Sequence, residues 1–405
     1  MDATQKHVLD GYKVLDFTQF VAGPTCTLMM AEMGAEVIKV EFAPRGDPTR
    51  AFPIMRDGRS GYFVQHNRGK QSLCVDLKRP EAAELIRELI RKVDVLVQNY
   101  APGVIGRMGF DYESVSALNP RIVMCSISGF GQTGPLAHLT GYDGCGQAVS
   151  GFTSMCGEPG EAPYLPMVAL GDVSTGAHAM GAVACALLYR ERTGKGQHLD
   201  ISLLDTYFHY HEAAVQMASL SGGEIEPTRS GRHAYYVAPA GIFKGRDGHL
   251  IIAAVDHQWT ALCNAMGRPE LAHDPRFDTN AARVANLKEM TVAIEDWLAS
   301  VSDNDAMELL DRNRVPFAPI LSVREAMNHP HLRERGTVRK VRDRVLGEFD
   351  LPGFALRFSE FKNALTLDAP FLGEHNERVL TSYLGYTGAR VAELERGGVL
   401  CSGPR

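Results

Sequence analysis

Short apolar runs alternate with helical spacing over the first 200 residues, and this pattern constrains the fold more than any other feature. Such alternation predicts a parallel sheet with helices packed on its faces. The expected strands lie at 12–17, 35–41, 72–76, 94–98, 121–126 and 197–201. The expected helices begin near Pro24, Pro80, Tyr112, Asp143 and Val173.

The pattern changes after an apolar helix expected at 201–219. Glycine and charged residues dominate 221–232, which predicts a linker. Beyond it, an Asp-Gly turn predicts a β-hairpin, followed by mixed spacing, with strands at 241–244, 249–254 and 316–321 and helices from His257, Ala281 and Asp303 to about Arg335. The tail shows strand spacing at 337–345 and 354–358 and a helix near 374–384.

These segments predict an α/β protein in two domains. Residues 1–220 form the first part of a large domain, 221–232 a linker, 233–330 a small α+β domain, and 331–405 a return linker and the rest of the large domain.

Composition excludes several classes of function. Lys and Arg number 42 against 48 Asp and Glu, so the net charge of −6 gives no positive field for nucleic acid. The longest apolar window, 180–189, is far shorter than the roughly 18 residues that a membrane span needs. The N-terminus lacks a secretory signal pattern, so we expect a cytoplasmic protein. Eight scattered cysteines show no zinc spacing, and we expect no metal.

Asp172 is the first candidate functional residue, because it follows Gly171 at the expected start of a long apolar helix. One interpretation is structural, since an aspartate here caps a helix and contributes about 1 kcal/mol. The other is chemical, since glycine admits a substrate and the helix dipole favours an ionised, nucleophilic carboxylate. The residues alone favour the cap.

Basic and amide side chains gather near the ends of the expected strands: Arg45, Arg50, Lys70, Asn99, Tyr100 and Arg107. Each alone is typical of a solvated surface. Together they form a candidate phosphate site in which Tyr100 stacks on a base. Arg232 and His233, at the linker, are either carboxylate-binding residues or surface residues.

A Gly-x-Gly-x-x-Gly stretch at 129–134 follows an expected strand, as in a nicotinamide-binding fingerprint. Pro135 follows at once and the next helix is expected only near Tyr142, which disfavours that cofactor. The stretch remains a candidate ligand-facing loop.

Seven segments stand out together, at 15–24, 34–41, 99–103, 107–110, 129–135, 171–172 and 193–197. In this order they resemble family III CoA-transferases, also called the formyl-CoA transferase or CaiB/BaiF family, from about residue 11 to 385. The resemblance implies a Rossmann-like large domain, a small domain and an interlocked homodimer. It also implies acyl-CoA thioesters and small carboxylic acids as substrates, with no permanently bound cofactor.

The family's catalytic aspartate matches Asp172, which reverses the preference for the cap. By resemblance, this carboxylate attacks the acyl-CoA to give an aspartyl anhydride, and the returning thiolate then gives an aspartyl-CoA thioester. The acceptor carboxylate forms a second anhydride, from which the thiolate takes the new acyl group.

The resemblance also assigns contacts with CoA, at Gln19, Phe20, Val21, Ala22, Lys70, Asn99, Tyr100 and Arg107. Tyr142 and Asp143 match the tyrosine-acid pair of the transferases. The related α-methylacyl-CoA racemases place a His-Asp pair there to move a proton. A tyrosine with an ordinary pKa of about 10 is a poor base, so a transferase is favoured over a racemase or epimerase.

Two features bear on the acceptor. Formyl-CoA transferase has Gln where this chain has Val21, and a glycine run that is missing here, which disfavours oxalate. Residues 232–243 resemble members that act on larger dicarboxylates such as succinate, mesaconate, itaconate or glutarate. We expect succinyl-CoA or a similar donor, and transfer within one molecule, as from C1 to C4 of mesaconyl-CoA, stays open.

Overall fold

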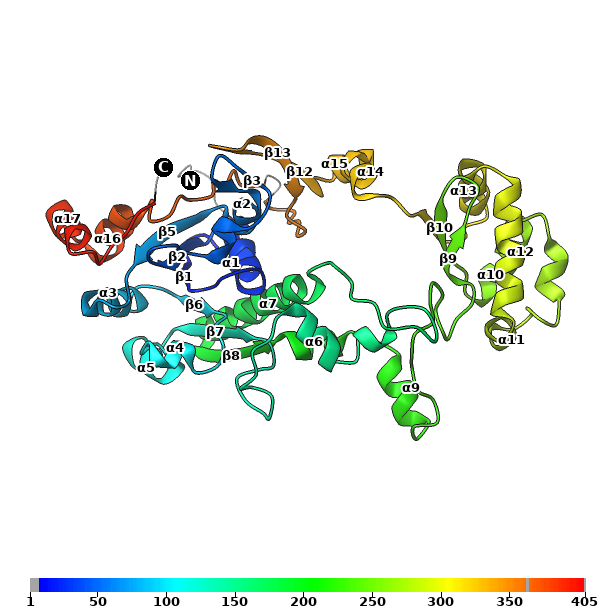
Figure 1. Cartoon of the computed structure of the whole chain (residues 1–405), viewed down its shortest axis with the longest axis horizontal. Helices are drawn as coiled ribbons and strands as arrows, with labels where there is room; N and C mark the ends of the chain where they lie inside the picture. The colour runs from blue at the N-terminus through cyan, green and yellow to red at the C-terminus, as the bar shows by residue number, and fades with distance from the viewer. Residues whose placement is uncertain (1–6, 362–363, 404–405) are drawn as a thin grey trace. The chain divides into compact units, whose positions relative to one another are not determined.

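A computed structural model describes residues 7–361 and 364–403 (Figure 1). The chain divides into two compact units. The large unit comprises the chain up to Phe152, Met167–Glu212 and the chain from Pro330 onward. The small unit comprises Thr153–Pro166 and Ala213–His329.

A six-stranded parallel sheet forms the centre of the large unit, in the order β5-β2-β1-β6-β7-β8. The strands are β1 Lys13–Asp16, β2 Glu36–Phe42, β5 Lys70–Val75, β6 Val95–Gln98, β7 Val123–Ser128 and β8 Gln197–Ser202. All six coincide with expected strands, within two residues at each end. The strand order reverses between β1 and β6, and ligands of such sheets bind at the carboxyl ends beside that point.

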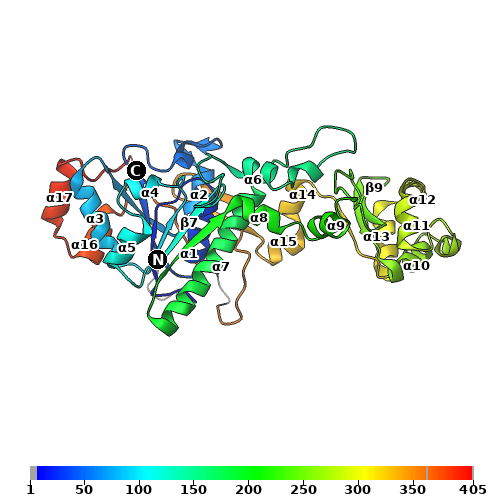
Figure 2. The same cartoon turned by 90° about the horizontal axis from the view of Figure 1, so that it is seen from below.

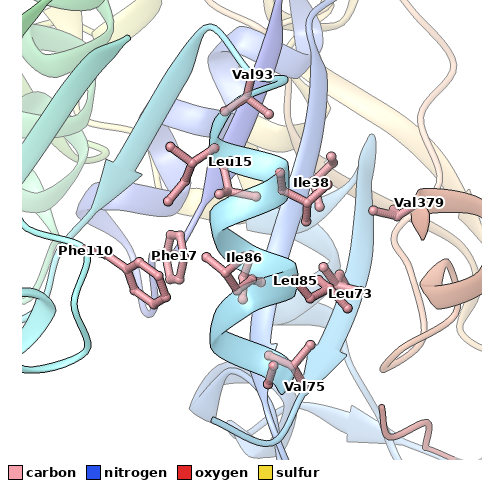
Figure 3. Packing of buried hydrophobic residues seen from close by; sticks show 14 of the residues in the cluster. Leu15, Phe17, Ile38, Leu73, Val75, Leu85, Ile86, Val93, Phe110 and Val379 are labelled. Carbon is pink, nitrogen blue, oxygen red and sulfur yellow. The ribbon is translucent and has the colours of Figure 1, made fainter. Parts of the chain in front are cut away.

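Helices cover both faces of this sheet. Because successive strand residues point to opposite faces, Val14 packs toward α1 (Ala22–Glu32) and α7 (Leu170–Thr193), whereas Leu15 packs toward α3 (Pro80–Ile90). Figure 3 shows Leu85 and Ile86 of α3 against the apolar strand residues. These two buried layers, one on each face, hold the sheet and therefore the loops that follow the carboxyl ends of its strands.

The C-terminal segment completes the layer around α3. It contributes α16 (Asn376–Leu384) and α17 (Gly388–Arg396), which lie beside α3 in Figures 1 and 2. Val379 and Val391 are buried in the same cluster as Leu15, and Leu400 pairs with Val75 of β5. The first and last parts of the chain therefore build one core.

Short elements complete the large unit. They are η1 Pro48–Ala51, β3 Met55–Arg56, β4 Arg59–Ser60, α2 Gly61–Asn67, α4 Val104–Arg107, α5 Tyr112–Leu118, α6 Asp143–Val149, α8 Leu203–His209, α15 Pro330–Glu334, β12 Val338–Asp343 and β13 Gly347–Pro352. Strands β12 and β13 form an antiparallel hairpin.

The small unit has an antiparallel sheet in the order β11-β10-β9 around a core that contains Trp259 and Leu298. Its elements are η2 Thr153–Met155, α9 Ala214–Leu220, β9 Ala240–Lys244, β10 His249–Ala253, α10 Asp256–Ala265, η3 Pro269–His273, α11 Asn280–Ala285, α12 Leu287–Ser300, α13 Asp303–Arg312, β11 Phe317–Pro319 and α14 Val323–Asn328.

Two expected elements are wrong. Residues 354–358 form no strand, because β12 pairs instead with β13, and Phe354 and Phe358 pack as loop residues on the core. The single helix expected at 201–219 is two helices, α8 and α9, separated at 210–213.

The division into units differs from the expected segments 1–220, 221–232, 233–330 and 331–405. Thr153–Pro166 groups with the small unit, where Arg229 donates to the Ser154 carbonyl at 2.9 Å and Gly231 donates to the Gly157 carbonyl at 3.0 Å. These hydrogen bonds join stretches that are 70 residues or more apart in sequence, and no local pattern encodes them.

Candidate active site

A cavity of about 260 Å³ opens at the carboxyl ends of β1, β6 and β7, at the reversal of strand order. The loop after β1 contributes Gln19, Phe20, Val21 and Ala22, and the loop after β6 contributes Asn99 and Tyr100. Tyr142 and Asp172 complete the part of the wall that carries reactive groups. The structure thus brings eight of the expected site residues to one cavity.

Asp172 is half-buried in the first turn of α7. The helix begins at Leu170 with Ala169 at the N-cap, so the capping role weighed for Asp172 is wrong. Burial, together with the nearby charge of Asp143, raises the pKa of Asp172 to about 7. The helix dipole therefore does not hold the pKa of this carboxyl at or below its ordinary value.

Asp143 accepts hydrogen bonds from the first turn of α7 and from two side chains. Its Oδ2 accepts the backbone N–H of Asp172 at 3.0 Å. Its Oδ1 accepts the Tyr207 hydroxyl and the Gln147 side-chain amide, the latter at 2.9 Å. The carboxylate of Asp143 therefore lies against the first turn of α7 and faces the Asp172 side chain with a like charge.

The loop after β1 is pinned by Asn99. The side-chain amide of Asn99 donates to the Gln19 carbonyl, and its oxygen accepts the Gln19 N–H, both at 2.8 Å. Next to it, Phe20 has φ +64°, a left-handed conformation that is strained for a phenylalanine and is often found at functional sites. Its ring lies 5.8 Å from that of Tyr142, which is 65% exposed. Two aromatic rings thus form one wall of the cavity.

Lys70 does not reach the cavity. Its side chain is fully buried, and its ammonium group lies 3.0 Å from Asp16 and donates to Thr27 Oγ1 at 2.8 Å and Asn67 Oδ1 at 3.0 Å. Desolvation lowers its pKa to about 8 despite Asp16. The structure corrects the expected CoA contact: Lys70 is a buried cation beneath the loop after β1.

The remaining expected cations also lie outside this cavity. Arg45 and Arg107 are exposed and do not line it. In the small unit, Arg232 pairs with Glu295 at 2.9 Å, and the His233 ring packs on that of Phe243. Among the described residues, no Lys, Arg or His lines the cavity.

Tyr100 lines the cavity with a ring that is already stacked within the protein. Its centroid lies 6.1 Å from that of Phe42, with 20° between the planes. Burial raises the pKa of its phenol. The stacking role expected for this ring is therefore partly taken by Phe42.

The sequence does not predict a role for Tyr207 or Gln147 in the site. Both lie in helices with ordinary apolar or small residues around them, and their contacts with Asp143 form only in the folded chain.

No helix among the described residues is long and apolar enough to cross a membrane, and within the same residues three or more metal-ligating side chains nowhere come together.

Comparison with known proteins decides the family. The model of CoA-transferase family III matches residues 9–376. The chain belongs to CoA-transferase family III. As a family III CoA-transferase it acts on CoA thioesters, and the cavity at the reversal of strand order is its candidate active site.

Relatives of this family III chain differ in their named acceptors. It is 35% identical over 405 residues to a mouse succinyl-CoA:glutarate CoA-transferase, covering 99% of this chain and 91% of the relative. It is 37% identical over 361 residues to an acetyl-CoA:oxalate CoA-transferase of Acetobacter aceti, covering 89% and 91%. A CaiB/BaiF family protein from Brucella suis, known from its crystal structure, is 36% identical with a TM-score of 0.81, covering 94% and 100%.

Proposed function

We propose that this CoA-transferase moves CoA from succinyl-CoA or a similar donor to a free dicarboxylate, with Asp172 as the nucleophile. The observation that carries the proposal is the half-buried Asp172 carboxyl in the wall of the cavity. A pKa of about 7 leaves much of this group ionised near neutral pH while making the anion more nucleophilic than an ordinary aspartate.

Four exchanges at carbonyl carbons balance the reaction. The Asp172 carboxylate attacks the donor thioester and expels CoA thiolate, which leaves an aspartyl anhydride. The thiolate attacks the Asp172 carbonyl and releases the donor acid, which leaves an aspartyl-CoA thioester. The acceptor carboxylate expels the thiolate again, and the thiolate takes the acceptor acyl group and frees Asp172. No proton is consumed, and each intermediate keeps its acyl group activated.

The cavity supports this chemistry through its lining. Phe20, Val21 and Ala22 offer apolar contact to the thioester end of the donor, and such contact excludes the water that would hydrolyse an anhydride. The loop that carries them is held by Asn99.

Two sources support the proposed acceptor. The mouse relative is named for glutarate and the Acetobacter relative for oxalate, both dicarboxylates. The sequence of 232–243 favours the larger acids, so we propose a dicarboxylate of four or five carbons. Tyr142 lies at the cavity wall, where the resembling racemases place a histidine, and this favours transfer over racemisation.

The test is a transfer assay with succinyl-CoA and a panel of free acids that contains glutarate, itaconate, mesaconate, oxalate and acetate. We expect new dicarboxylyl-CoA from the wild type and a loss of at least about 1,000-fold in Asp172→Ala. Asp311→Ala, which removes an exposed carboxylate from α13, is the control and should keep full activity.

Hydroxylamine trapping of the acyl-enzyme should place the adduct on Asp172. An adduct on another residue, or full activity of Asp172→Ala, would overturn the role of Asp172. Deuterium exchange at the α-carbon of a 2-methylacyl-CoA, without CoA transfer, would establish a racemase instead.

A further inference from the structure

The hydroxyl of Tyr207 connects Asp143 with the first turn of α7, which carries Asp172. It donates to Asp143 Oδ1 and accepts the backbone N–H of Gly171 at 2.8 Å. Gly171 directly precedes Asp172 in the first turn of α7. One phenol oxygen therefore ties α8, α6 and the start of α7 together.

Close packing reinforces this link. A Cβ added to Gly171 would lie 2.1 Å from Cε2 of Tyr207, so the ring lies directly on the glycine backbone. The Tyr207 side chain is fully buried and does not line the cavity. Tyr207 therefore cannot touch a substrate there, and any effect on the reaction must pass through its neighbours.

The carboxylate of Asp143 is saturated with donors. It accepts the Tyr207 hydroxyl and the Gln147 amide on one oxygen and the Asp172 N–H on the other. These three donors fix the orientation of the Asp143 carboxylate, and its charge raises the pKa of Asp172.

We propose that Tyr207 is a positioning residue for acyl transfer, whose hydroxyl holds the Asp143 carboxylate against the first turn of α7 and so aligns Asp172. The inference rests on the proposed function of Asp172 as nucleophile. The anhydride and thioester intermediates convert the Asp172 carboxylate into a neutral acyl group. A fixed negative charge beside it therefore destabilises the free carboxylate relative to the acylated enzyme and favours acylation.

The experiment compares Tyr207→Phe with Tyr210→Phe. Phenylalanine keeps the ring on Gly171 and removes only the hydroxyl. Tyr210 ends the same helix, with its ring 6.3 Å from that of Tyr207, so it is a matched control. For Tyr207→Phe we expect kcat to fall about 10- to 100-fold, with a change of less than about threefold in KM for succinyl-CoA. Tyr210→Phe should match the wild type.

A second measurement separates a loss of Asp172 alignment from a general loss of structure. Intact mass of the enzyme with succinyl-CoA and no acceptor gives the fraction that is acylated or carries CoA covalently. That fraction should fall in Tyr207→Phe and in Asp143→Asn, which keeps a hydrogen-bond acceptor but removes the charge. The affinity for free CoA, measured by calorimetry, should stay within about twofold.

Wild-type kcat in Tyr207→Phe would overturn the proposal. A parallel loss of kcat and CoA affinity in both variants would also overturn it, because it indicates a structural role alone. If Tyr207→Phe does not fold, Asp143→Asn decides: an unchanged acylated fraction overturns the proposal. These results are distinct from failure of the proposed function, in which Asp172→Ala itself keeps transferring CoA.

Discussion

The surroundings of Asp172 set its pKa and therefore its reactivity. Its pKa of about 7 lies well above the ordinary value because burial removes water and Asp143 repels the anion. The neighbouring first-turn amides that could have stabilised it are bonded to Asp143 and Tyr207. A helix terminus thus makes a strong acid only when its N–H groups remain available.

This raised pKa predicts the pH dependence of the reaction. The carboxylate is the nucleophile, so kcat/KM should decline as pH falls through about 7 and the carboxyl becomes protonated. Asp143→Asn removes the repelling charge, which lowers the pKa of Asp172 and moves this decline to lower pH. Rate profiles between pH 5 and 9 measure both, and a decline at the same pH in the two proteins would contradict this account.

Lys70 gives a second prediction at this scale. Lys70→Met should cost about 3–5 kcal/mol of unfolding free energy, because it leaves Asp16 buried without its cation. Arg45→Met, at an exposed cation, should change it by less than about 0.5 kcal/mol. Urea unfolding measures the difference, and similar values for both variants would show that Asp16 is not paired in solution.

Among the elements, α7 contains three glycines, and substitutions at two of them should change stability in opposite directions. Gly171 lies under the Tyr207 ring, whereas a Cβ at Gly181 would meet nothing within 4 Å. Gly171→Ala should lower stability by about 1–3 kcal/mol through overpacking and reduce transfer through the displaced ring. Gly181→Ala should raise stability by about 0.5–1 kcal/mol, since alanine favours a helix interior.

Thermal unfolding and the transfer assay measure this pair. Equal stability changes at the two positions would contradict the close packing of Tyr207 on Gly171, because helix propensity alone does not distinguish the two glycines.

The strands of the large unit were predictable because a sheet covered on both faces needs near-continuous apolar runs. The prediction of a strand at 354–358 was wrong because loop residues such as Phe358 also pack on the core, so an apolar aromatic residue does not distinguish a loop from a buried strand. Helix α17 was missed, because only Val391 and Leu394 are buried in this charged segment.

Part of the site was predictable because its residues follow a strand, and Asp172 was a candidate because it follows a glycine at a helix start. Asn99 comes directly after β6, and the switch-point rule sends such residues to the ligand. The link from Tyr207 to Asp143 spans 64 residues and depends on how α6 and α8 pack, which no local spacing encodes. The expected CoA contact of Lys70 was wrong because nothing in the sequence shows that a lysine at the start of a strand is buried.

For the whole molecule, the surface of the large unit predicts self-association. Val149, Val173 and Phe208 are 45–52% exposed on three packed helices, α6, α7 and α8. Such apolar exposure is typical of an interface. We predict a homodimer in which the two chains interlock, with a mass of twice 44.3 kDa by light scattering. Phe208→Glu should weaken it, and a monomer at micromolar concentration would contradict the prediction.

The shared core of the large unit has a consequence for synthesis on the ribosome. Val379, Val391 and Leu400 are needed to cover the layer that Leu15 and Ile38 begin. The ribosome makes these closing residues only after the entire small unit. The nascent large unit therefore carries an open apolar face while the small unit is being made, and molecular chaperones are its natural cover until the closing residues emerge.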